Sequence, residues 1–183
     1  MSTACVLLFD GFEEIEAIST VDVLRRGGVE VMTASLAAPT VTGAHQLALK
    51  AETSIEDLRT GKSQALFDAL IIPGGPGVLQ WRHNPVVSGL IQQYYQASHL
   101  VAAICAAPIL LYDLGILEKH RYTAHFSMEE LTPHARLHEL VVTDGNIITG
   151  CGPAAGIPFG LAILRYLTNT EIVKKVAHGM MIP

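Results

Sequence analysis

Hydrophobic residues fall into two patterns that alternate along this chain. The first is a short, continuous apolar run bounded by glycine, proline or charged residues, such as the run that ends before Asp10. Runs of this kind are typical of parallel strands covered on both faces. They predict strands over residues 4–9, 30–34, 69–72 and 100–104, and then a hairpin over residues 140–149 that turns at Asp144-Gly145-Asn146.

The second pattern is a stretch in which apolar residues recur at helical spacing. In residues 13–26 it is carried by Ile15, Ile18 and Val21, and Gly27-Gly28 ends it. Further helices are predicted over residues 54–58, with Ser54 as a cap, and over 84–97, 107–114, 156–167 and 170–178. Alternating strands and helices predict an α/β fold: a doubly wound, mostly parallel sheet with helices on both faces. At 183 residues, we expect a single domain over residues 1–183.

Two weaker segments complete this prediction. Residues 41–52 alternate between apolar and polar side chains, which predicts an exposed hairpin, and residues 122–124 predict a strand edge. In open parallel sheets, ligands bind beyond the carboxyl ends of the strands. The residues that directly follow each predicted strand are therefore the first candidates for function.

Charge narrows the classes of partner. Charged residues make up 16% of the chain, compared with about 25% in a typical soluble protein. So little charge indicates strands buried on both faces or a subunit interface, and we expect a homodimer. A net charge of −5 disfavours a general nucleic-acid binder, which needs a basic patch, so no specific nucleic-acid partner is predicted.

The cellular location follows from the apolar runs and the cysteines. No run reaches the roughly 18 residues of a membrane span, and the N-terminal segment lacks the basic region of a signal peptide. The three cysteines, Cys5, Cys105 and Cys151, cannot all pair within one chain, and none stands in a CxxC spacing. We therefore expect a cytoplasmic protein with no membrane partner, no metal site and no cofactor.

Cys105 is the strongest candidate for chemistry. It stands between a predicted strand and a predicted helix, with Ala103 and Ala107 two residues away on either side. A nucleophile elbow needs small residues at those two positions, because its turn is tight. The dipole of the following helix lowers the pKa of a thiol from about 8.5, so we expect a reactive thiolate. A buried structural cysteine is the alternative, because free cysteine is among the most buried residue types.

Two other groups follow strand ends. Gly74-Gly75 can bring backbone N–H groups close to a ligand, or form an oxyanion hole with the N–H of Ala106; the alternative is a plain turn. Glu16 opens the first helix, where an acid usually complements the helix dipole. If Glu16 faces Cys105, it must be protonated, and it then donates a hydrogen bond to the thiolate.

The histidines and the last cysteine are weaker candidates. His125 follows the predicted strand edge and can act as the base or orienting group of a cysteine nucleophile. Cys151 either lies near the same strand ends or fills a turn. The remaining histidines have no ligand-like spacing, and His134 and His138 lack the HExxH context of a metal site, so both are expected on the surface.

Taken together, these residues resemble the ThiJ/PfpI superfamily, in the branch of Parkinson disease protein 7 and its bacterial relatives. The resemblance covers nearly the whole chain, and its segments are highly specific in combination. They are residues 11–17, 21–28, 72–75, 102–108 and 152–153. The resemblance implies a flavodoxin-like fold and a homodimer with the active site close to the dimer interface.

The resemblance also implies roles for individual residues. By position, Cys105 matches the reactive cysteine, Glu16 the protonated acid and His125 the nearby histidine, while Gly75 and Ala106 match the backbone donors beside the sulfur. Two positions depart from the pattern. His45 and Cys151 stand where members of this branch often carry arginines that would hold an anionic group near the thiol. Their presence disfavours a substrate with a carboxylate or phosphate, and makes both residues candidates for the pocket.

Two classes of function follow from the resemblance. The first is cofactor-independent, cysteine-dependent conversion of small 2-oxoaldehydes or their adducts, as in glyoxalases and deglycases. The second is redox sensing or chaperone-like protection under oxidative stress, in which the cysteine is oxidised to a sulfinate without significant turnover. The partner is therefore a small aldehyde or an oxidant. A peptidase activity is disfavoured, because that branch needs a histidine directly after the elbow cysteine, where this chain has Ala106.

Overall fold

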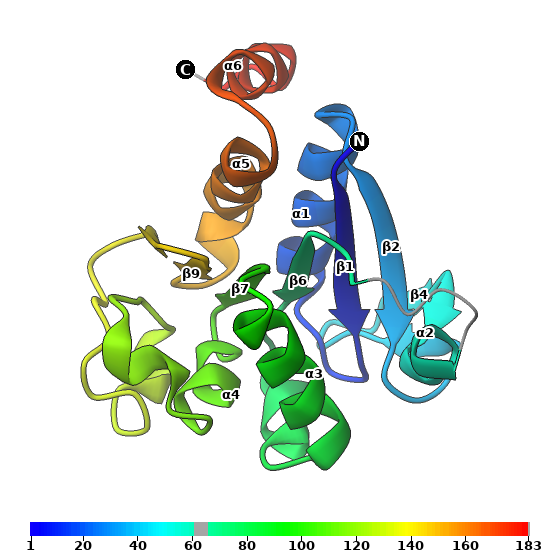
Figure 1. The fold of residues 1–183 in the computed structure, drawn as a ribbon, viewed down its shortest axis with the longest axis vertical. Coiled ribbons are helices and arrows are strands. Elements are labelled where there is room, and N and C mark those ends of the chain that lie inside the picture. The colour runs from blue at the N-terminus through cyan, green and yellow to red at the C-terminus, as the bar shows by residue number, and fades with distance from the viewer. Residues whose placement is uncertain (61–65, 183) are drawn as a thin grey trace.

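The computed structural model describes residues 1–60 and 66–182, which fold around one central sheet (Figure 1). The described residues form a sheet of seven strands in the order β5-β2-β1-β6-β7-β9-β8, and only β8 and β9 pair in antiparallel fashion. The strands are β1 (Thr3–Leu8), β2 (Glu30–Ser35), β5 (Thr53–Ser54), β6 (Ala69–Ile72), β7 (Leu100–Ile104), β8 (Val141–Asp144) and β9 (Ile147–Gly150). This is the mostly parallel, doubly wound α/β sheet that the alternating pattern predicts.

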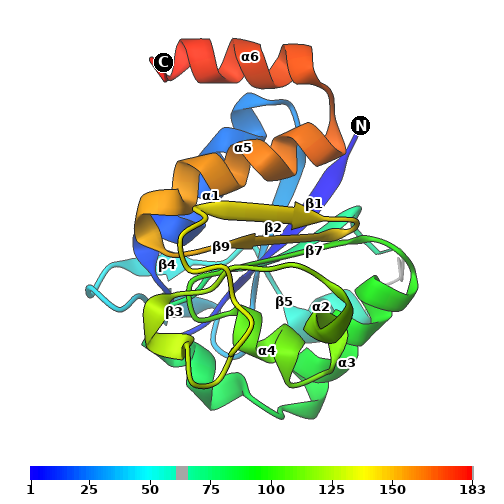
Figure 2. The ribbon, with the colours of Figure 1, turned by 90° about the vertical axis from the view of Figure 1, so that its left-hand side faces the viewer.

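Helices cover both faces of this sheet (Figure 2). One face carries α1 (Glu14–Arg26) and α5 (Gly156–Leu167), which pack against each other, and α6 (Thr170–Gly179) lies beyond α5. The other face carries α2 (Ile55–Thr60), α3 (Pro85–Gln96) and α4 (Pro108–Tyr112). Short 3-10 helices occupy η1 (Pro76–Trp81), η2 (Ile116–Lys119), η3 (Phe126–Met128) and η4 (Pro153–Ala155).

The inner strands explain why their sequences are continuous apolar runs. Every residue of β6, β7 and β9 is buried, as is all of β1 after Thr3. A strand covered by helices on both faces cannot place polar side chains on alternate positions without burying them. The hydrophobic core therefore lies on both sides of the sheet, and it fixes the positions of the strand ends.

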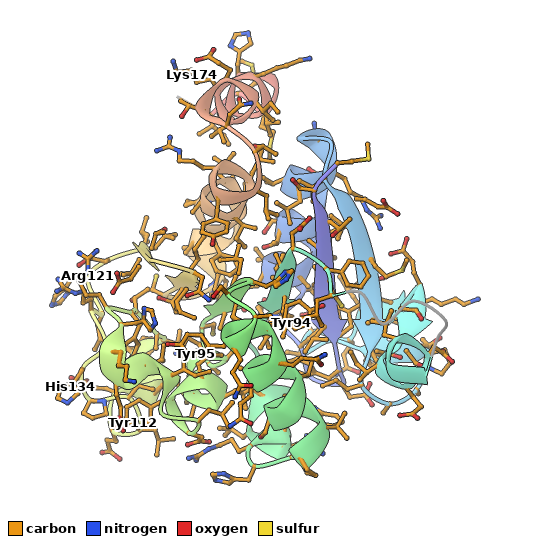
Figure 3. The ribbon with its side chains drawn as sticks, in the orientation of Figure 1. Tyr94, Tyr95, Tyr112, Arg121, His134 and Lys174 are labelled. Carbon is orange, nitrogen blue, oxygen red and sulfur yellow. The ribbon has the colours of Figure 1, made fainter. Side chains whose placement is uncertain are left out.

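Side chains link the helices on the second face to the rest of the fold (Figure 3). The buried hydroxyl of Tyr94 on α3 accepts a hydrogen bond from the N–H of Phe67 at 3.2 Å. The hydroxyl of Tyr95 is 3.1 Å from Nε2 of His120, which follows η2. His134 and His138 are exposed, as the sequence predicts.

The hairpin and the capped helix are confirmed. In the hairpin, β3 (Thr40–Thr42) pairs in antiparallel fashion with β4 (Ala48–Lys50). The hydroxyl of Ser54 caps α2 by accepting the N–H of Asp57 at 3.0 Å.

The predicted strand edge at residues 122–124 is wrong. The backbone there bonds to side chains and loops, since the N–H of Thr123 donates to Oγ1 of Thr149 at 2.9 Å.

The topology gathers the candidate residues at one edge of the sheet. Because β1, β6, β7 and β9 run parallel, their carboxyl ends lie together. The segments that follow these ends hold Glu16, Gly74-Gly75, Cys105 and Cys151. Among the described residues, no helix has the length and apolar character needed to cross a membrane.

Candidate active site

Cys105 forms the predicted turn between β7 and the residues that lead into α4. Its φ angle is +64°, in the left-handed region that residues other than glycine seldom adopt. Holding such a residue there costs about 1–3 kcal/mol, so the surrounding structure must impose it. The N–H of Cys105 donates to the carbonyl of Gly150 at 2.8 Å, and the flanking Ala103 and Ala107 are fully buried. The turn has the backbone strain and close packing of a nucleophile elbow.

Two backbone donors point at the sulfur. The N–H groups of Gly75 and Ala106 hydrogen-bond the Cys105 thiol. Gly75 has a φ of +100°, and a Cβ there would lie 2.3 Å from the carbonyl oxygen of Gly11, so only glycine fits. Gly74, predicted as a further donor beside the thiol, instead donates its N–H to Oε2 of Glu16 at 2.8 Å. The residues that follow β6 thus supply one N–H donor to the sulfur of Cys105 and one to the carboxyl group of Glu16.

Glu16 lies in the first turn of α1 and is 1% exposed. Its carboxyl group contacts the Cys105 thiol, and its Oε1 is buried without a hydrogen-bond partner among the described residues. Burial raises the pKa of Glu16 to about 7, an effect opposed by the hydrogen bonds from Gly74 and with Cys105 and reinforced by the charge of Glu13. An acid in this position changes its protonation close to neutral pH.

The thiol and the acid control each other's ionisation. Burial, followed by the negative charge of Glu16, raises the pKa of Cys105 to about 12, although the Gly75 and Ala106 N–H groups lower it. The low thiol pKa expected from the sequence is therefore wrong, because burial alone already raises it. Once Glu16 holds the proton, the repulsion disappears and Oε1 gains a hydrogen to donate to the sulfur. A protonated Glu16 therefore favours the thiolate, because it removes the charge that raises the thiol pKa next after burial.

This buried acid makes stability depend on pH. The folded-state pKa of Glu16 is raised to about 7 from 4.5, so its contribution is fully present below about pH 4.5 and is lost as the pH rises through 7. At about 1.4 kcal/mol per pKa unit, the loss is about 3 kcal/mol. We therefore expect Glu16→Gln to gain about 3 kcal/mol relative to wild type between about pH 4.5 and 8, as measured by urea unfolding. A difference that stays constant with pH would contradict this electrostatic description.

His125 lies beside the elbow, but its ring is held by other residues. Its N–H donates to the carbonyl of Cys105 at 2.9 Å. The ring Nδ1 is 2.8 Å from the hydroxyl of Ser127 and accepts the N–H of Ser127 at 3.3 Å, so the neutral ring carries its proton on Nε2. The sequence analysis missed Ser127, because nothing in its spacing marks a serine as an orienting group. His125 is therefore held against the backbone of Cys105, while its ring hydrogen-bonds to Ser127.

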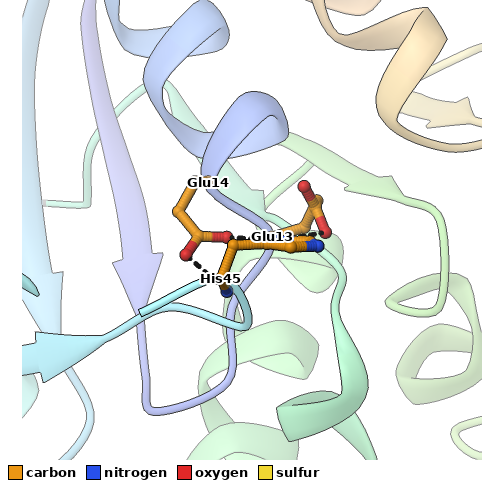
Figure 4. Close-up of side chains that lie close together, drawn as sticks. All are labelled: Glu13, Glu14 and His45. Carbon is orange, nitrogen blue, oxygen red and sulfur yellow. Dashed lines mark hydrogen bonds and ion pairs between the residues drawn. The ribbon is translucent and has the colours of Figure 1, made fainter. Parts of the chain in front are cut away.

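His45 joins the site through two acids at the start of α1 (Figure 4). Its Nδ1 is 3.1 Å from Oε2 of Glu14 and 3.6 Å from Oε2 of Glu13. The hydrogen bond to Glu14, followed by the charges of Glu13 and Glu14, raises the pKa of His45. The three residues place ligand atoms within 4.8 Å of one another, close enough to share a cation, and a protonated His45 supplies the same charge itself. The sequence analysis missed this grouping, because His45 comes from the β3–β4 hairpin.

Cys151 lies directly beyond β9 and is half-buried. Burial raises the pKa of its thiol, and the charge of Glu16 raises it further. The next residue, Gly152, lies against the ring of His125, where an added Cβ would be 3.2 Å from Cδ2. Cys151 therefore borders the same site as Cys105, Glu16 and His125.

Comparisons with known proteins identify relatives of this chain. The chain is 32% identical to protein dj-1beta of Drosophila melanogaster, over 98% of this chain and 97% of that protein. It is 33% identical to the glutathione-independent glyoxalase DJR-1.2 of Caenorhabditis elegans, over 87% and 84% of the two chains.

Solved structures show the same fold. The crystal structure of Drosophila melanogaster DJ-1beta matches with a TM-score of 0.92 at 33% identity, and covers 100% of both chains. The structure described as oxidized Toxoplasma gondii DJ-1 matches with a TM-score of 0.91 at 28% identity, over 99% of this chain and 98% of that one. A sequence model of the DJ-1/PfpI family matches residues 2–166. On this evidence, the chain belongs to the DJ-1/PfpI family.

Proposed function

We propose that this protein converts small 2-oxoaldehydes into 2-hydroxy acids, with Cys105 as the nucleophile and without a cofactor. The observation that carries the proposal is the strained Cys105, which meets two backbone N–H donors and a buried carboxyl group. That combination can activate a sulfur and stabilise an oxyanion formed beside it. The relative in Caenorhabditis elegans that is named a glutathione-independent glyoxalase supports the same reaction class.

The first step is attack by sulfur. With the proton on Glu16, the Cys105 thiolate adds to the aldehyde carbon. The alkoxide that forms takes the proton from Glu16, which gives a hemithioacetal and leaves Glu16 ionised, able to act as a base. The carbonyl oxygen gains negative charge as the carbon–sulfur bond forms. The N–H groups of Gly75 and Ala106, which already face the sulfur, are placed to stabilise that charge.

The second step moves a proton between the two carbons of the substrate. A base removes the proton from the former aldehyde carbon, and an acid returns a proton to the neighbouring carbon, which leaves a thioester of the 2-hydroxy acid. Water then hydrolyses the thioester and frees the sulfur. Glu16 suits this proton transfer better than His125, because Glu16 contacts the sulfur and has a pKa of about 7. The ring of His125 is instead engaged by Ser127.

The charges around the site favour a neutral substrate. Glu13 and Glu14 lie at the start of α1 beside Glu16, and His45, when protonated, is engaged by ion pairs with both. Such a site repels a carboxylate or phosphate more than it repels an uncharged aldehyde. Methylglyoxal and glyoxal fit this requirement, and so do the adducts that they form with amines and thiols.

The product provides the test. Purified protein mixed with methylglyoxal, without added thiol, should produce lactate. Proton NMR detects the lactate as it forms. Heat-inactivated protein is the control for spontaneous reaction. Consumption of methylglyoxal without lactate would indicate adduct formation on the protein and would refute the enzymatic proposal.

A second candidate function is oxidation of the same thiol under oxidative stress. The observation that favours it is the buried, unpartnered Oε1 of Glu16, which can donate a hydrogen bond to a sulfinate oxygen when protonated. The related Toxoplasma gondii structure is described as oxidized.

Three free thiols suit a reducing compartment, so we also propose that the protein is cytoplasmic.

We also propose a homodimer that uses the exposed face of α1. Ile15 and Ile18 on this face are 58% and 44% exposed, and Ile18 borders a hollow shared with Val21 and Leu49. Exposed apolar residues grouped in this way mark interaction surfaces. Because Ile15 precedes Glu16 directly, the interface would lie next to the active site.

Light scattering should therefore give twice the chain mass of 19.6 kDa. The double variant Ile15→Glu, Ile18→Glu should give the mass of a single chain, because it places charges in an interface of at least about 1,000 Å². Val86→Glu provides a matched control, since Val86 is 39% exposed on α3 at the opposite face of the sheet. A wild-type mass of one chain at micromolar concentration would exclude the dimer.

A further inference from the structure

Two of the three cysteines stand opposite each other at the ends of neighbouring strands. Strands β7 and β9 lie side by side (Figure 2), Ile104 of β7 pairs with Gly150 of β9, and each strand is followed directly by a cysteine. The N–H of Cys105 still donates to the carbonyl of Gly150 at 2.8 Å, so ladder spacing persists to this point. Neighbouring strands lie about 4.8 Å apart, and disulfides join Cα atoms about 4.4 to 6.8 Å apart. The register of the two strands therefore favours a position of Cys105 and Cys151 from which a disulfide could join them.

The two thiols also share a neighbour, the carboxyl group of Glu16. The carboxyl group of Glu16 contacts the Cys105 thiol, and its charge acts on the Cys151 thiol. Cys151 is half-buried, so it is open enough to react, while Cys105 is 9% exposed. Cys5 cannot replace either one, because it is buried within β1, and β6 separates β1 from β7.

We propose that Cys151 is a resolving thiol that converts a Cys105 sulfenic acid into a reversible disulfide between the two residues. A hydroperoxide first transfers an oxygen atom to the Cys105 thiolate, which gives the sulfenic acid and releases water or an alcohol. The Cys151 sulfur then attacks the Cys105 sulfur. The sulfur–sulfur bond forms as the sulfur–oxygen bond breaks, and the departing hydroxide takes the Cys151 proton and leaves as water.

The electron balance gives the disulfide a protective role. The two thiols lose two electrons, and the peroxide gains them. Without a resolving thiol, a second peroxide carries the sulfenic acid on to a sulfinate, which thiols do not reduce. A disulfide stops the oxidation one step earlier, and a cellular thiol restores both cysteines by exchange. This inference goes beyond aldehyde conversion and does not depend on it.

Mass spectrometry after limited oxidation tests the proposal. Full-length protein is treated with near-equimolar hydrogen peroxide, and its free thiols are then alkylated in denaturant. Wild type should take up one alkyl group instead of three, because two of its thiols are joined. A non-reduced digest should contain one peptide pair joined through Cys105 and Cys151. A dithiol reductant should reverse the change. Cys151→Ser should instead accumulate Cys105 sulfinate, at least about fivefold above wild type at the same peroxide dose.

Matched variants separate the outcomes. Cys5→Ala should keep the disulfide, because Cys5 lies two strands away from β7. Cys151→Ala repeats the test if the serine variant is unstable. Equal rates of sulfinate formation in wild type and Cys151→Ser would overturn the proposal, as would a disulfide that joins two chains or involves Cys5. Because mass is the readout, absence of aldehyde turnover would refute the proposed enzyme and leave this result intact.

Discussion

Cys105→Ser is expected to lower kcat/KM for methylglyoxal by at least about a thousandfold, because it removes the nucleophile. A serine hydroxyl does not ionise beside a carboxyl group in a buried site. The donors at Gly75 and Ala106 remain, but they act on charge that develops only after a nucleophile has attacked. Lactate formation at saturating and limiting methylglyoxal measures the change.

The substitution is a clean test, because serine fits the same space. It keeps the volume of the side chain at a position whose φ of +64° is imposed by the surrounding turn. The melting temperature of the variant should therefore stay within a few degrees of wild type. Cys5→Ser is the control that should retain turnover, because Cys5 is buried within β1. Turnover near the wild-type level in folded Cys105→Ser would remove this thiol from the mechanism.

Glu16→Gln is expected to separate catalysis from oxidation. An amide keeps the shape of the carboxyl group and can donate a hydrogen bond to sulfur, but it cannot give and take a proton. If Glu16 moves the proton between the substrate carbons, turnover should fall about a hundredfold or more, the usual scale of general acid–base catalysis. Sulfinate formation needs an accessible thiolate and a hydrogen-bond donor, so peroxide should still oxidise Cys105.

One variant is measured in two assays, lactate formation from methylglyoxal and mass spectrometry after peroxide. Glu13→Gln is the matched control. Glu13 affects the pKa of Glu16 through its charge, but of these two acids only Glu16 contacts the thiol. The control variant should change turnover much less than Glu16→Gln. Turnover close to wild type in Glu16→Gln would exclude Glu16 as the proton carrier and leave His125 as the remaining candidate base.

The sequence predicts the elbow and its partners because topology places them. Once β1, β6 and β7 are recognised as parallel strands, their carboxyl ends must share an edge. Glu16, Gly75 and Cys105 then meet without any knowledge of side-chain geometry. Contacts made by loops do not follow in this way. Ser127 orients His125 from a 3-10 turn, and His45 reaches Glu13 and Glu14 from a hairpin outside the main sheet.

The pKa of the Cys105 thiol could not be predicted from the local sequence pattern. A helix start favours a thiolate, and the sequence analysis relied on that effect. In the structure, burial and the charge of Glu16 outweigh the two N–H donors and raise the pKa of Cys105 to about 12. The pKa of Cys105 depends on whether Glu16 holds a proton. It also depends on burial by residues that are far apart in the chain.

The most direct test of Cys105 as the nucleophile is to observe the substrate on its sulfur. Protein mixed with methylglyoxal is quenched in acid at successive times, digested and mapped by mass spectrometry. An adduct of one methylglyoxal on Cys105 should appear before lactate and disappear as the aldehyde is consumed. Lactate formation with no adduct on Cys105 at any time, or with a transient adduct on Cys5 or Cys151 instead, would contradict this role of Cys105.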